Sequence, residues 1–185
     1  MMKINKYFKG KVILITTKKF IDKRGYFSEI FKKVLINKIG IKNNFIQENI
    51  AFSKEIETLR GLHFQKPPFD QAKLIKVIHG KILDVVVDLR KESKTFGKFK
   101  KFKLSDNKEQ YLFIGSGFAH GYKTLTKNVK IIYKVDKYYS PKNEVTLLWS
   151  DTNLNINWEI KNKKFFISNK DKKGLTFINF NSPFN

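Results

Sequence analysis

The sequence predicts an all-β protein of the jelly-roll type, a β-sandwich barrel with a few short helices. Segments rich in Ile, Val, Phe and Tyr recur at roughly 8–12-residue spacing, as expected of a sandwich or barrel. A hydrophobic content of 41%, with 18 phenylalanines, suits a packed core. No internal repeat and no linker divides the chain, so we expect one domain over residues 1–185.

Each predicted strand follows from β-branched and aromatic residues, several of them alternating with polar ones. In ILDVVVDL, alternation gives one apolar face, with Asp84 and Asp88 on the other. His79-Gly80-Lys81 is interpreted as the turn of a hairpin. In chain order, the predicted strands are VILIT (12–16), YFSEIF (26–31), NFIQENIAFS (44–53), KLIKVIH (73–79), ILDVVVDL (82–89), KKFKL (100–104), QYLFI (110–114), FAHGYKTL (118–125) and NVKIIYKVDKYY (128–139).

Two short helices complete the expected fold. FKKVLINKI, at 31–39, has helical spacing of its apolar residues, and Gly40 follows as a C-terminal stop. A second short helix is expected after Ser168.

Composition excludes several kinds of chemistry. The chain has no cysteine, so disulfides, thiolate metal ligands and cysteine nucleophiles are absent. The apolar run that starts at Val12 is much shorter than the ~20 residues of a membrane span, and too short for a signal sequence. We therefore expect a soluble cytoplasmic protein that does not associate with membranes.

The net charge of +22 raises the possibility of a nucleic-acid partner. Lysines occur in every segment rather than on one face or tail, which indicates a bias of the whole chain. The densest cluster, KTFGKFKKFK at 94–103, alternates Lys with Phe and is typical of a strand with one solvated edge. We expect no nucleic-acid partner, although the positive field favours anionic substrates such as phosphate esters.

The stretch TLRGLHFQ, at 58–65, places a histidine inside an apolar strand. Strict alternation would direct Arg60 and His63 to opposite faces. Gly61 lies between them and is a natural site for a bulge that re-aims one of the two side chains.

Other polar residues also interrupt apolar strands. His120 shares a strand face with Phe118 and Tyr122, and Tyr133 shares one with Ile131 and Val135; Gln47, Asn49 and Lys73 are further cases. If these faces line the barrel interior, two histidines, a lysine, a tyrosine and an arginine occupy one cavity. Each residue alone is more simply a core or surface residue, so only their joint occurrence favours a site.

A metal site is not expected. The position two residues after His63 holds Gln65 rather than a second histidine, and the only carboxylate in the following segment is Asp70, in a Pro-rich loop. Two strand histidines fall short of the ligands that a metal site needs. His79, at a turn, is interpreted as a solvated residue, and no phosphate-binding glycine motif occurs. We expect neither metal nor cofactor.

Proton transfer without a metal fits the remaining residues. A histidine can accept a proton at neutral pH, and a carboxylate partner fixes its tautomer. A tyrosine on the opposite wall can supply a proton, while a lysine and a second histidine stabilise an oxyanion. This set suits removal of a proton α to a carbonyl and its return to the other face, which is epimerisation.

The chain resembles the dTDP-4-dehydrorhamnose 3,5-epimerase family of nucleotide-sugar enzymes, which have a cupin-like fold. LRGLHFQ, GFAHG and YYSP are specific to the family when they occur together. The resemblance runs in order through residue 171. The matching stretches are DKRGYFSE (22–29), FIQENIAFS (45–53), LRGLHFQ (59–65), QAKLIKV (71–77), GKILDVVVDLRKESKTFGKF (80–99), GFAHGYKTL (117–125), YKVDKYYSPKNE (133–144), LLWSD (147–151) and ISNKD (167–171).

The resemblance implies roles for these residues. His63 would be the base, oriented by Asp171, and Tyr133 the acid on the opposite face. Lys73 and His120 would hold the C4 oxygen as it becomes an enolate. In the substrate-binding set, Arg24, Arg60 and Lys170 would bind the pyrophosphate, Tyr139 would stack on thymine, and Phe27, Glu29, Gln47, Glu48, Asn49 and Glu144 would place the nucleoside and sugar.

The resemblance also implies the substrate, the product and an assembly. A dTDP-linked 4-keto sugar, dTDP-4-dehydro-6-deoxy-D-glucose, would become dTDP-4-dehydro-β-L-rhamnose for L-rhamnose and surface-polysaccharide synthesis. The Arg24 segment would reach the site of a neighbouring subunit in a homodimer. Open alternatives are a C3-only epimerase, an epimerase of another nucleotide-linked 4-keto sugar, a non-catalytic sugar- or nucleotide-binding β-barrel, and a nucleic-acid binder that uses Phe and Lys.

Overall fold

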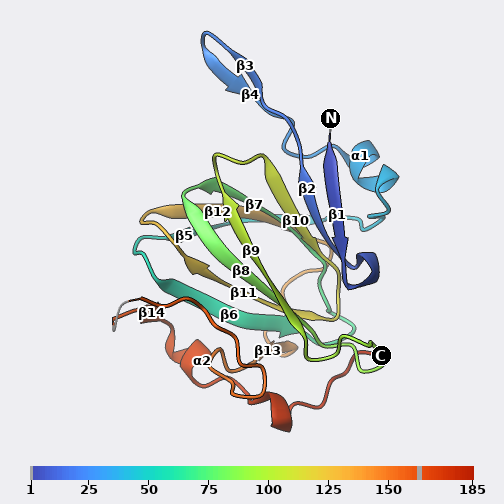
Figure 1. Ribbon diagram of the computed structural model, residues 1–185. Helices are drawn as coiled ribbons and strands as arrows, with labels where there is room; N and C mark the ends of the chain where they lie inside the picture. Colours follow the sequence, from blue (N-terminus) through green and yellow to red (C-terminus); the bar gives the residue numbers. More distant parts are fainter. Residues whose placement is uncertain (1, 162–163) are drawn as a thin grey trace.

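The computed structural model describes residues 2–161 and 164–185. Two large β-sheets face each other, as Figure 1 shows, which confirms the predicted jelly-roll sandwich. Sheet I has the order β1 (Lys3–Tyr7), β2 (Val12–Thr16), β10 (Gln110–Ile114), β7 (Lys73–His79), β12 (Val129–Val135), β5 (Gln47–Ser53). Sheet II has the order β13 (Glu144–Thr146), β6 (Thr58–Gln65), β11 (Phe118–Thr124), β8 (Lys81–Asp88), β9 (Phe99–Ser105), and β14 (Phe166–Ile167) pairs with β6.

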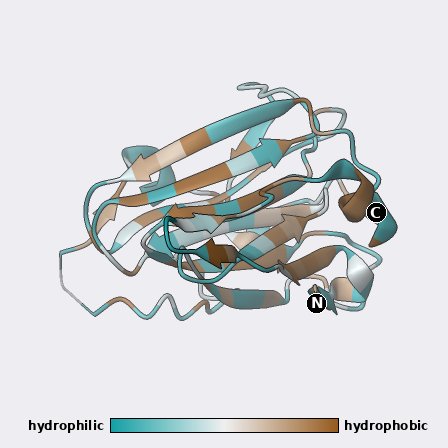
Figure 2. Ribbon diagram, turned by 90° about the horizontal axis from the view of Figure 1, so that it is seen from above, coloured by the Kyte–Doolittle hydropathy of each residue, from teal (hydrophilic) through white to brown (hydrophobic). Residues whose placement is uncertain are grey.

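Brown and teal segments alternate along the strands in Figure 2, which is the period-2 pattern of side chains on opposite faces. Residues of both sheets meet in the interior, among them Val12, Ile75, Val86 and Ile131. Each outer face has a cluster of its own. The chain around Ile39 and Ile41 covers sheet I, and the segment after β13 covers sheet II.

Coverage of both faces explains the composition of β8. The strand is apolar on its inner face through Ile82 and Val86 and on its outer face through Val85 and Val87. The predicted apolar face is therefore correct, but the opposite face is buried as well. Its aspartates must find partners inside the protein, because a buried charge without a partner is costly.

The predicted hairpin at His79-Gly80-Lys81 is wrong. Strand β7 pairs with β10 and β12 in sheet I, whereas β8 pairs with β9 and β11 in sheet II. The tight turn therefore carries the chain from one sheet to the other. Gly80 has a φ of 83°, and a Cβ there would lie 2.5 Å from Thr126 Oγ1, so the turn requires glycine.

Both helices occur where the sequence predicts them. Helix α1 (Lys33–Lys38) is shorter than expected and ends before Gly40, whose φ is 96°. Helix α2 (Asn169–Lys172) begins after Ser168, whose Oγ accepts a hydrogen bond from Asp171 N at 3.1 Å. Two 3₁₀ turns, Phe8–Gly10 and Phe177–Asn179, complete the elements. Within the described ranges, no helix has the length and apolarity needed to cross a membrane.

The strand expected over 26–31 is shorter in the structure. Residues Phe20–Asp22 (β3) and Gly25–Phe27 (β4) form a two-stranded hairpin that pairs only with itself. We call residues 20–27 the arm. Figure 1 shows the arm projecting from the body of the sandwich. Phe20, Tyr26 and Phe27 on it are all about two-thirds exposed, at 60%, 64% and 66%.

Candidate active site

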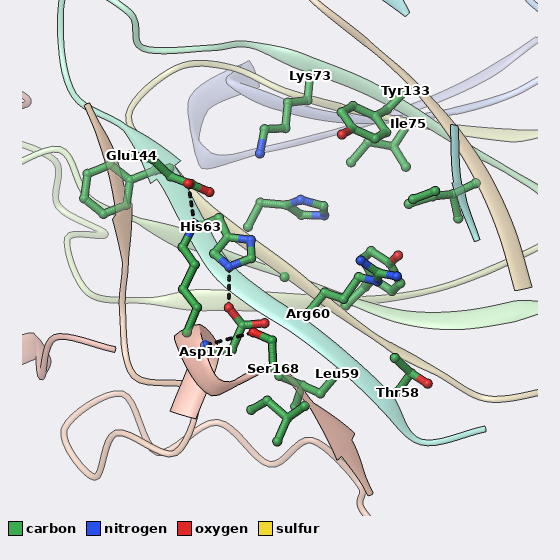
Figure 3. A pocket seen from close by; sticks show the side chains of 18 of the residues that line it. Thr58, Leu59, Arg60, His63, Lys73, Ile75, Tyr133, Glu144, Ser168 and Asp171 are labelled. Atoms are coloured by element: carbon green, nitrogen blue, oxygen red, sulfur yellow. Dashed lines mark hydrogen bonds and ion pairs between the residues drawn. The ribbon is translucent and has the colours of Figure 1, made fainter. Parts of the chain in front are cut away.

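A cavity of about 570 Å³ opens between the two sheets, within the range typical of small-molecule sites. Strands β6 and β11 of sheet II form one wall, and β7 and β12 of sheet I form the other. The chain around β13, β14 and α2 contributes to the rim. Figure 3 shows His63 on one side of this space, with Lys73 and Tyr133 on the other.

The predicted bulge at Gly61 is confirmed. His63 pairs with His120 and Arg60 with Tyr122, so β6 carries one more residue than β11 between these pairs. A Cβ on Gly61 would lie 2.6 Å from Gly121 Cα, which shows how closely the two backbones approach. The extra residue turns Arg60 and His63 to the same side, and both line the cavity.

His63 is held by Asp171. The His63 Nε2 to Asp171 Oδ1 distance is 2.6 Å, and Asp171 is 3% exposed at the first turn of α2. Burial acts to raise the pKa of Asp171, but the hydrogen bonds from His63, Ser168 and Gly61 N outweigh it and hold the pKa below its usual range. The carboxylate is thus charged, fixes the imidazole and leaves Nδ1 for proton transfer.

His120 has an equivalent partner that the sequence did not predict. Its Nε2 lies 2.8 Å from Asp84 Oδ2, and Asp84 is fully buried in β8. The signal was present, since an aspartate inside the apolar run ILDVVVDL needs a buried partner. Among the described residues, no group of three or more His, Asp or Glu side chains is placed to hold a metal ion.

Lys73 and Tyr133 extend into the cavity from sheet I (Figure 3). Burial lowers the pKa of Lys73 to about 8, against the opposing charges of Asp84 and Glu144. Burial raises the pKa of Tyr133, with smaller contributions from Tyr122 and Glu144 and an opposing one from Arg60. Near neutral pH the amine is still mostly charged and the phenol keeps its proton, so both groups are hydrogen-bond and proton donors.

Lys73→Met is expected to stabilise the fold by up to about 3 kcal/mol at pH 7, because a pKa unit is worth about 1.36 kcal/mol and the Lys73 pKa falls from 10.5 to about 8. Between pH 8 and 10.5 the unfolded chain binds more protons than the folded protein. The destabilisation caused by burying the charged Lys73 amine is therefore full below pH 8 and fades as the pH rises through this window. Urea unfolding at pH 7 and 10 measures the gain, with exposed Lys130→Met as the control. A less stable Lys73→Met protein at pH 7 contradicts the desolvation argument.

Polar residues at the rim of the cavity are joined to one another. The Tyr139 hydroxyl donates to Glu144 Oε2 at 2.6 Å, and Lys170 forms an ion pair with the same oxygen. Burial acts to raise the pKa of Glu144, but the hydrogen bonds of Lys170 and Tyr139 hold it below its usual range. All three residues line the cavity with Arg60, as the sequence predicts for binding residues.

The QEN stretch on β5 divides between two faces. Gln47 and Asn49 line a second, smaller hollow that shares Tyr133, Tyr139 and Glu144 with the main cavity, whereas Glu48 does not line it. Glu48 lies on the other face of the strand, and its Oε1 is 2.7 Å from Lys134 Nζ. The structure thus does not bring Glu48 into the site expected from the sequence.

Three further predicted binding residues lie outside the cavity of their own chain. Arg24 is at the tip of the arm and pairs with Asp22 at 2.6 Å. Phe27 ends the arm, and Glu29 follows it, with its carboxylate 2.8 Å from Lys32 Nζ. These side chains can serve a site only if the arm reaches one on another molecule.

Tyr122 is a further cavity residue that the sequence did not predict as functional. It is 5% exposed, and its hydroxyl makes no hydrogen bond of regular geometry within the described chain. Burial raises its pKa, while the Ser53 hydroxyl and the Arg60 guanidinium act in the opposite direction. The sequence placed Tyr122 on the face of His120, and that shared face was the available signal.

Known proteins resemble this chain in sequence and in fold. The profile of the dTDP-4-dehydrorhamnose 3,5-epimerase family matches residues 9–179. An enzyme of that name from Shigella flexneri is 40% identical over 168 residues, which cover 90% of this chain and 91% of the relative.

Two solved structures are similar over nearly all of the chain. The Bacillus anthracis dTDP-4-dehydrorhamnose 3,5-epimerase, with TDP and PPi bound, is 39% identical, with a TM-score of 0.91 and coverage of 96% of this chain and 100% of that one. The Legionella pneumophila dTDP-6-deoxy-D-glucose-3,5-epimerase, in complex with dTDP-4-keto-L-rhamnose, is 32% identical, with a TM-score of 0.93 and coverage of 100% and 99%. The match of sequence and fold leads to one conclusion: this chain belongs to the dTDP-4-dehydrorhamnose 3,5-epimerase family, a family of isomerases.

Proposed function

We propose that the protein converts dTDP-4-dehydro-6-deoxy-D-glucose to dTDP-4-dehydro-β-L-rhamnose by epimerisation at C3 and C5. The observation that carries the proposal is the placement of the His63–Asp171 pair and Tyr133 on opposite walls of one cavity. A sugar ring between them has a base on one face and an acid on the other. Family membership supplies the substrate class.

The first step is removal of a proton next to the ketone. The C4 carbonyl acidifies the hydrogens at C3 and C5, because the electron pair left by either proton moves onto the carbonyl oxygen. His63 accepts the proton, and the Asp171 carboxylate stabilises the resulting imidazolium. Lys73 and His120 donate to the C4 oxygen as it becomes an enolate, which lowers the energy of the charged intermediate.

The second step returns a proton to the opposite face. Tyr133 donates its phenolic proton to the same carbon, the carbonyl re-forms, and the carbon is inverted. Exchange with solvent restores neutral His63 and protonated Tyr133. Because the ketone activates both neighbouring carbons, the same two groups can serve C3 and C5 in turn, and the residues proposed here perform each step without a redox change.

The diphosphate of the substrate is proposed to bind at the rim. Arg60 presents a guanidinium, which matches phosphate geometry with paired donors, and Lys170 adds a point charge. Tyr139 offers an aromatic face to the thymine ring. Gln47, Asn49 and Glu144 provide polar groups for the nucleoside and sugar.

The proposal includes a homodimer in which the arm completes the neighbouring site. The support is the position of Arg24 and Phe27 on an exposed arm whose residues line neither of the two cavities described above. Arg24 would add a third cation for the diphosphate, Phe27 an apolar face and Glu29 a carboxylate. The cytoplasmic location expected from the sequence, and a role in L-rhamnose supply for surface polysaccharide, belong to the same proposal.

Solvent exchange tests the proposed reaction. In D2O, the purified protein is expected to place deuterium at C3 and C5 of dTDP-4-dehydro-6-deoxy-D-glucose and to form the L-rhamnose configuration, observed by NMR. Deuterium at C3 alone would identify a C3 epimerase instead. Absence of exchange with this and other nucleotide-linked 4-keto sugars contradicts the proposal, and steeply salt-dependent oligonucleotide binding without exchange favours a nucleic-acid binder.

Mixing an impaired variant with an inactive one tests the exchange of arms. Arg24→Ala is expected to lower kcat/KM by about 10–100-fold through loss of a charge-assisted contact, and His63→Ala to be inactive. A mixed dimer pairs an intact His63 with the intact Arg24 of the other chain, so co-refolding equal amounts restores about one quarter of the wild-type sites. If activity only equals the sum of the two parents, the arm does not serve the neighbouring site.

A further inference from the structure

The residues on either side of the arm, which we call its root, both contact the carboxylate of Glu109, outside the cavity. Lys19 precedes the arm, and its Nζ lies 3.4 Å from Glu109 Oε1. Ser28 follows the arm, and its Oγ donates to Glu109 Oε2 at 2.6 Å. The two ends of an eight-residue projection are thus held by the two oxygens of a single side chain.

Glu109 is itself firmly held by sheet I. It is 7% exposed, and the equally buried Lys76 donates to its Oε2 at 2.6 Å. Thr17 N donates to the Glu109 carbonyl at 2.8 Å, and the Lys76 Nζ lies 4.6 Å from the centre of the Tyr111 ring. Burial acts to raise the pKa of Glu109, but the hydrogen bonds of Lys76 and Ser28 hold it below its usual range, so the group is a charged, fixed acceptor.

The contacts continue from this carboxylate into the arm. Lys19 Nζ also donates to the Asp106 carbonyl at 3.0 Å and lies 4.1 Å from the centre of the Tyr26 ring on β4. The arm makes its strand pairs only with itself, so these root contacts determine the direction in which it leaves the sheet.

We infer that Glu109 is a positioning residue that aims the arm, and with it Arg24 and Phe27, at the neighbouring active site. This inference rests on the proposed function for the role of the arm, but not for the anchoring itself. An arm fixed before assembly loses little conformational entropy when it docks, which favours substrate binding in the shared site.

If Glu109 served only to stabilise the fold, its contact with Lys76 would be sufficient and its contacts with Lys19 and Ser28 would not affect the arm. Lys76 and Glu109 alone already neutralise each other, and losing only the contacts from Lys19 and Ser28 would leave that buried pair intact. The double variant Lys19→Ala/Ser28→Ala therefore separates anchoring from folding. Glu109→Gln is less suitable because it weakens the only carboxylate partner that the structure gives Lys76 in the described chain.

A spin label at the arm tip measures anchoring directly. The chain has no cysteine, so Lys23→Cys creates a unique labelling position on an exposed residue. Lys19→Ala/Ser28→Ala is expected to increase label mobility in electron paramagnetic resonance spectra, whereas Lys18→Ala, an exposed neighbour of the same charge, is expected to leave them unchanged. Equal spectra for both variants overturn the inference.

Kinetics on the unlabelled variants measure the consequence. Lys19→Ala/Ser28→Ala is expected to raise KM by about tenfold with little change in kcat, because binding rather than chemistry depends on the aim of the arm. Unchanged KM despite a mobile arm overturns the positioning role. The spectra need no turnover, so a protein that lacks epimerase activity yet shows anchoring refutes the proposed function and not the anchoring.

Discussion

His63→Ala is expected to lower kcat/KM by about 10³–10⁴-fold and to abolish deuterium exchange at both C3 and C5, in line with the upper range for loss of a general base. The reason is geometric, since His63 lies on the wall opposite Tyr133 and its imidazole is held at 2.6 Å by the charged Asp171 carboxylate. His120, the other cavity histidine, is bonded to Asp84 and lies toward the C4 oxygen in the proposed pose. NMR in D2O measures both exchange and conversion.

Two variants control this experiment. His79→Ala removes a histidine whose side chain is 60% exposed and lies outside the cavity, so its activity should equal wild type. Asp171→Asn keeps the shape but removes the charge that stabilises the imidazolium, and a loss of about 10²-fold is expected. A His63→Ala protein that exchanges at the wild-type rate refutes the assignment of the base.

The fold could be predicted where local pattern determines structure. The alternation in the strands, the stop at Gly40 and the helix after Ser168 all depend on neighbours in sequence, and each prediction is confirmed. The turn at Gly80 could not be predicted correctly, because a hairpin and a crossing between sheets use the same tight glycine turn. Which one forms depends on the partners of β7 and β8, which lie far away in the chain.

In the candidate site, too, features that depend on local pattern could be predicted, and features that depend on distant parts of the chain could not. His120 and Tyr133 could be identified as candidate site residues because a polar residue inside an apolar strand needs a buried hydrogen-bond partner or a function. The approach of Asp171 to His63, 108 residues away, came from the family resemblance and from no local pattern. Glu48 points away from Gln47 and Asn49 because successive side chains alternate along a strand, a local pattern that the family resemblance overrode. The direction of the arm depends on contacts of Lys19 and Ser28 with Glu109, which is far away in the chain, so it does not follow from local sequence.

Tyr133→Phe is expected to lower net epimerisation by about 10²–10³-fold, within the range for loss of a general acid, while retaining exchange at C3 better than conversion. The hydroxyl is the part removed, and the ring still lines the same wall as Ile75 and Ile131. The base on the other wall remains, so protons still leave and return on the His63 side. Deuterium then enters without inversion.

This separation of exchange from inversion distinguishes an acid from a packing residue. A packing defect would disturb substrate placement and lower exchange and epimerisation together, whereas loss of an acid affects only return to the opposite face. Burial raises the pKa of Tyr133, so the wild-type phenol holds its proton at neutral pH and can deliver it. Tyr7→Phe, which alters a tyrosine packed on Phe102 outside the cavity, should leave both rates unchanged. Equal loss of exchange and epimerisation in Tyr133→Phe would remove the acid from the mechanism.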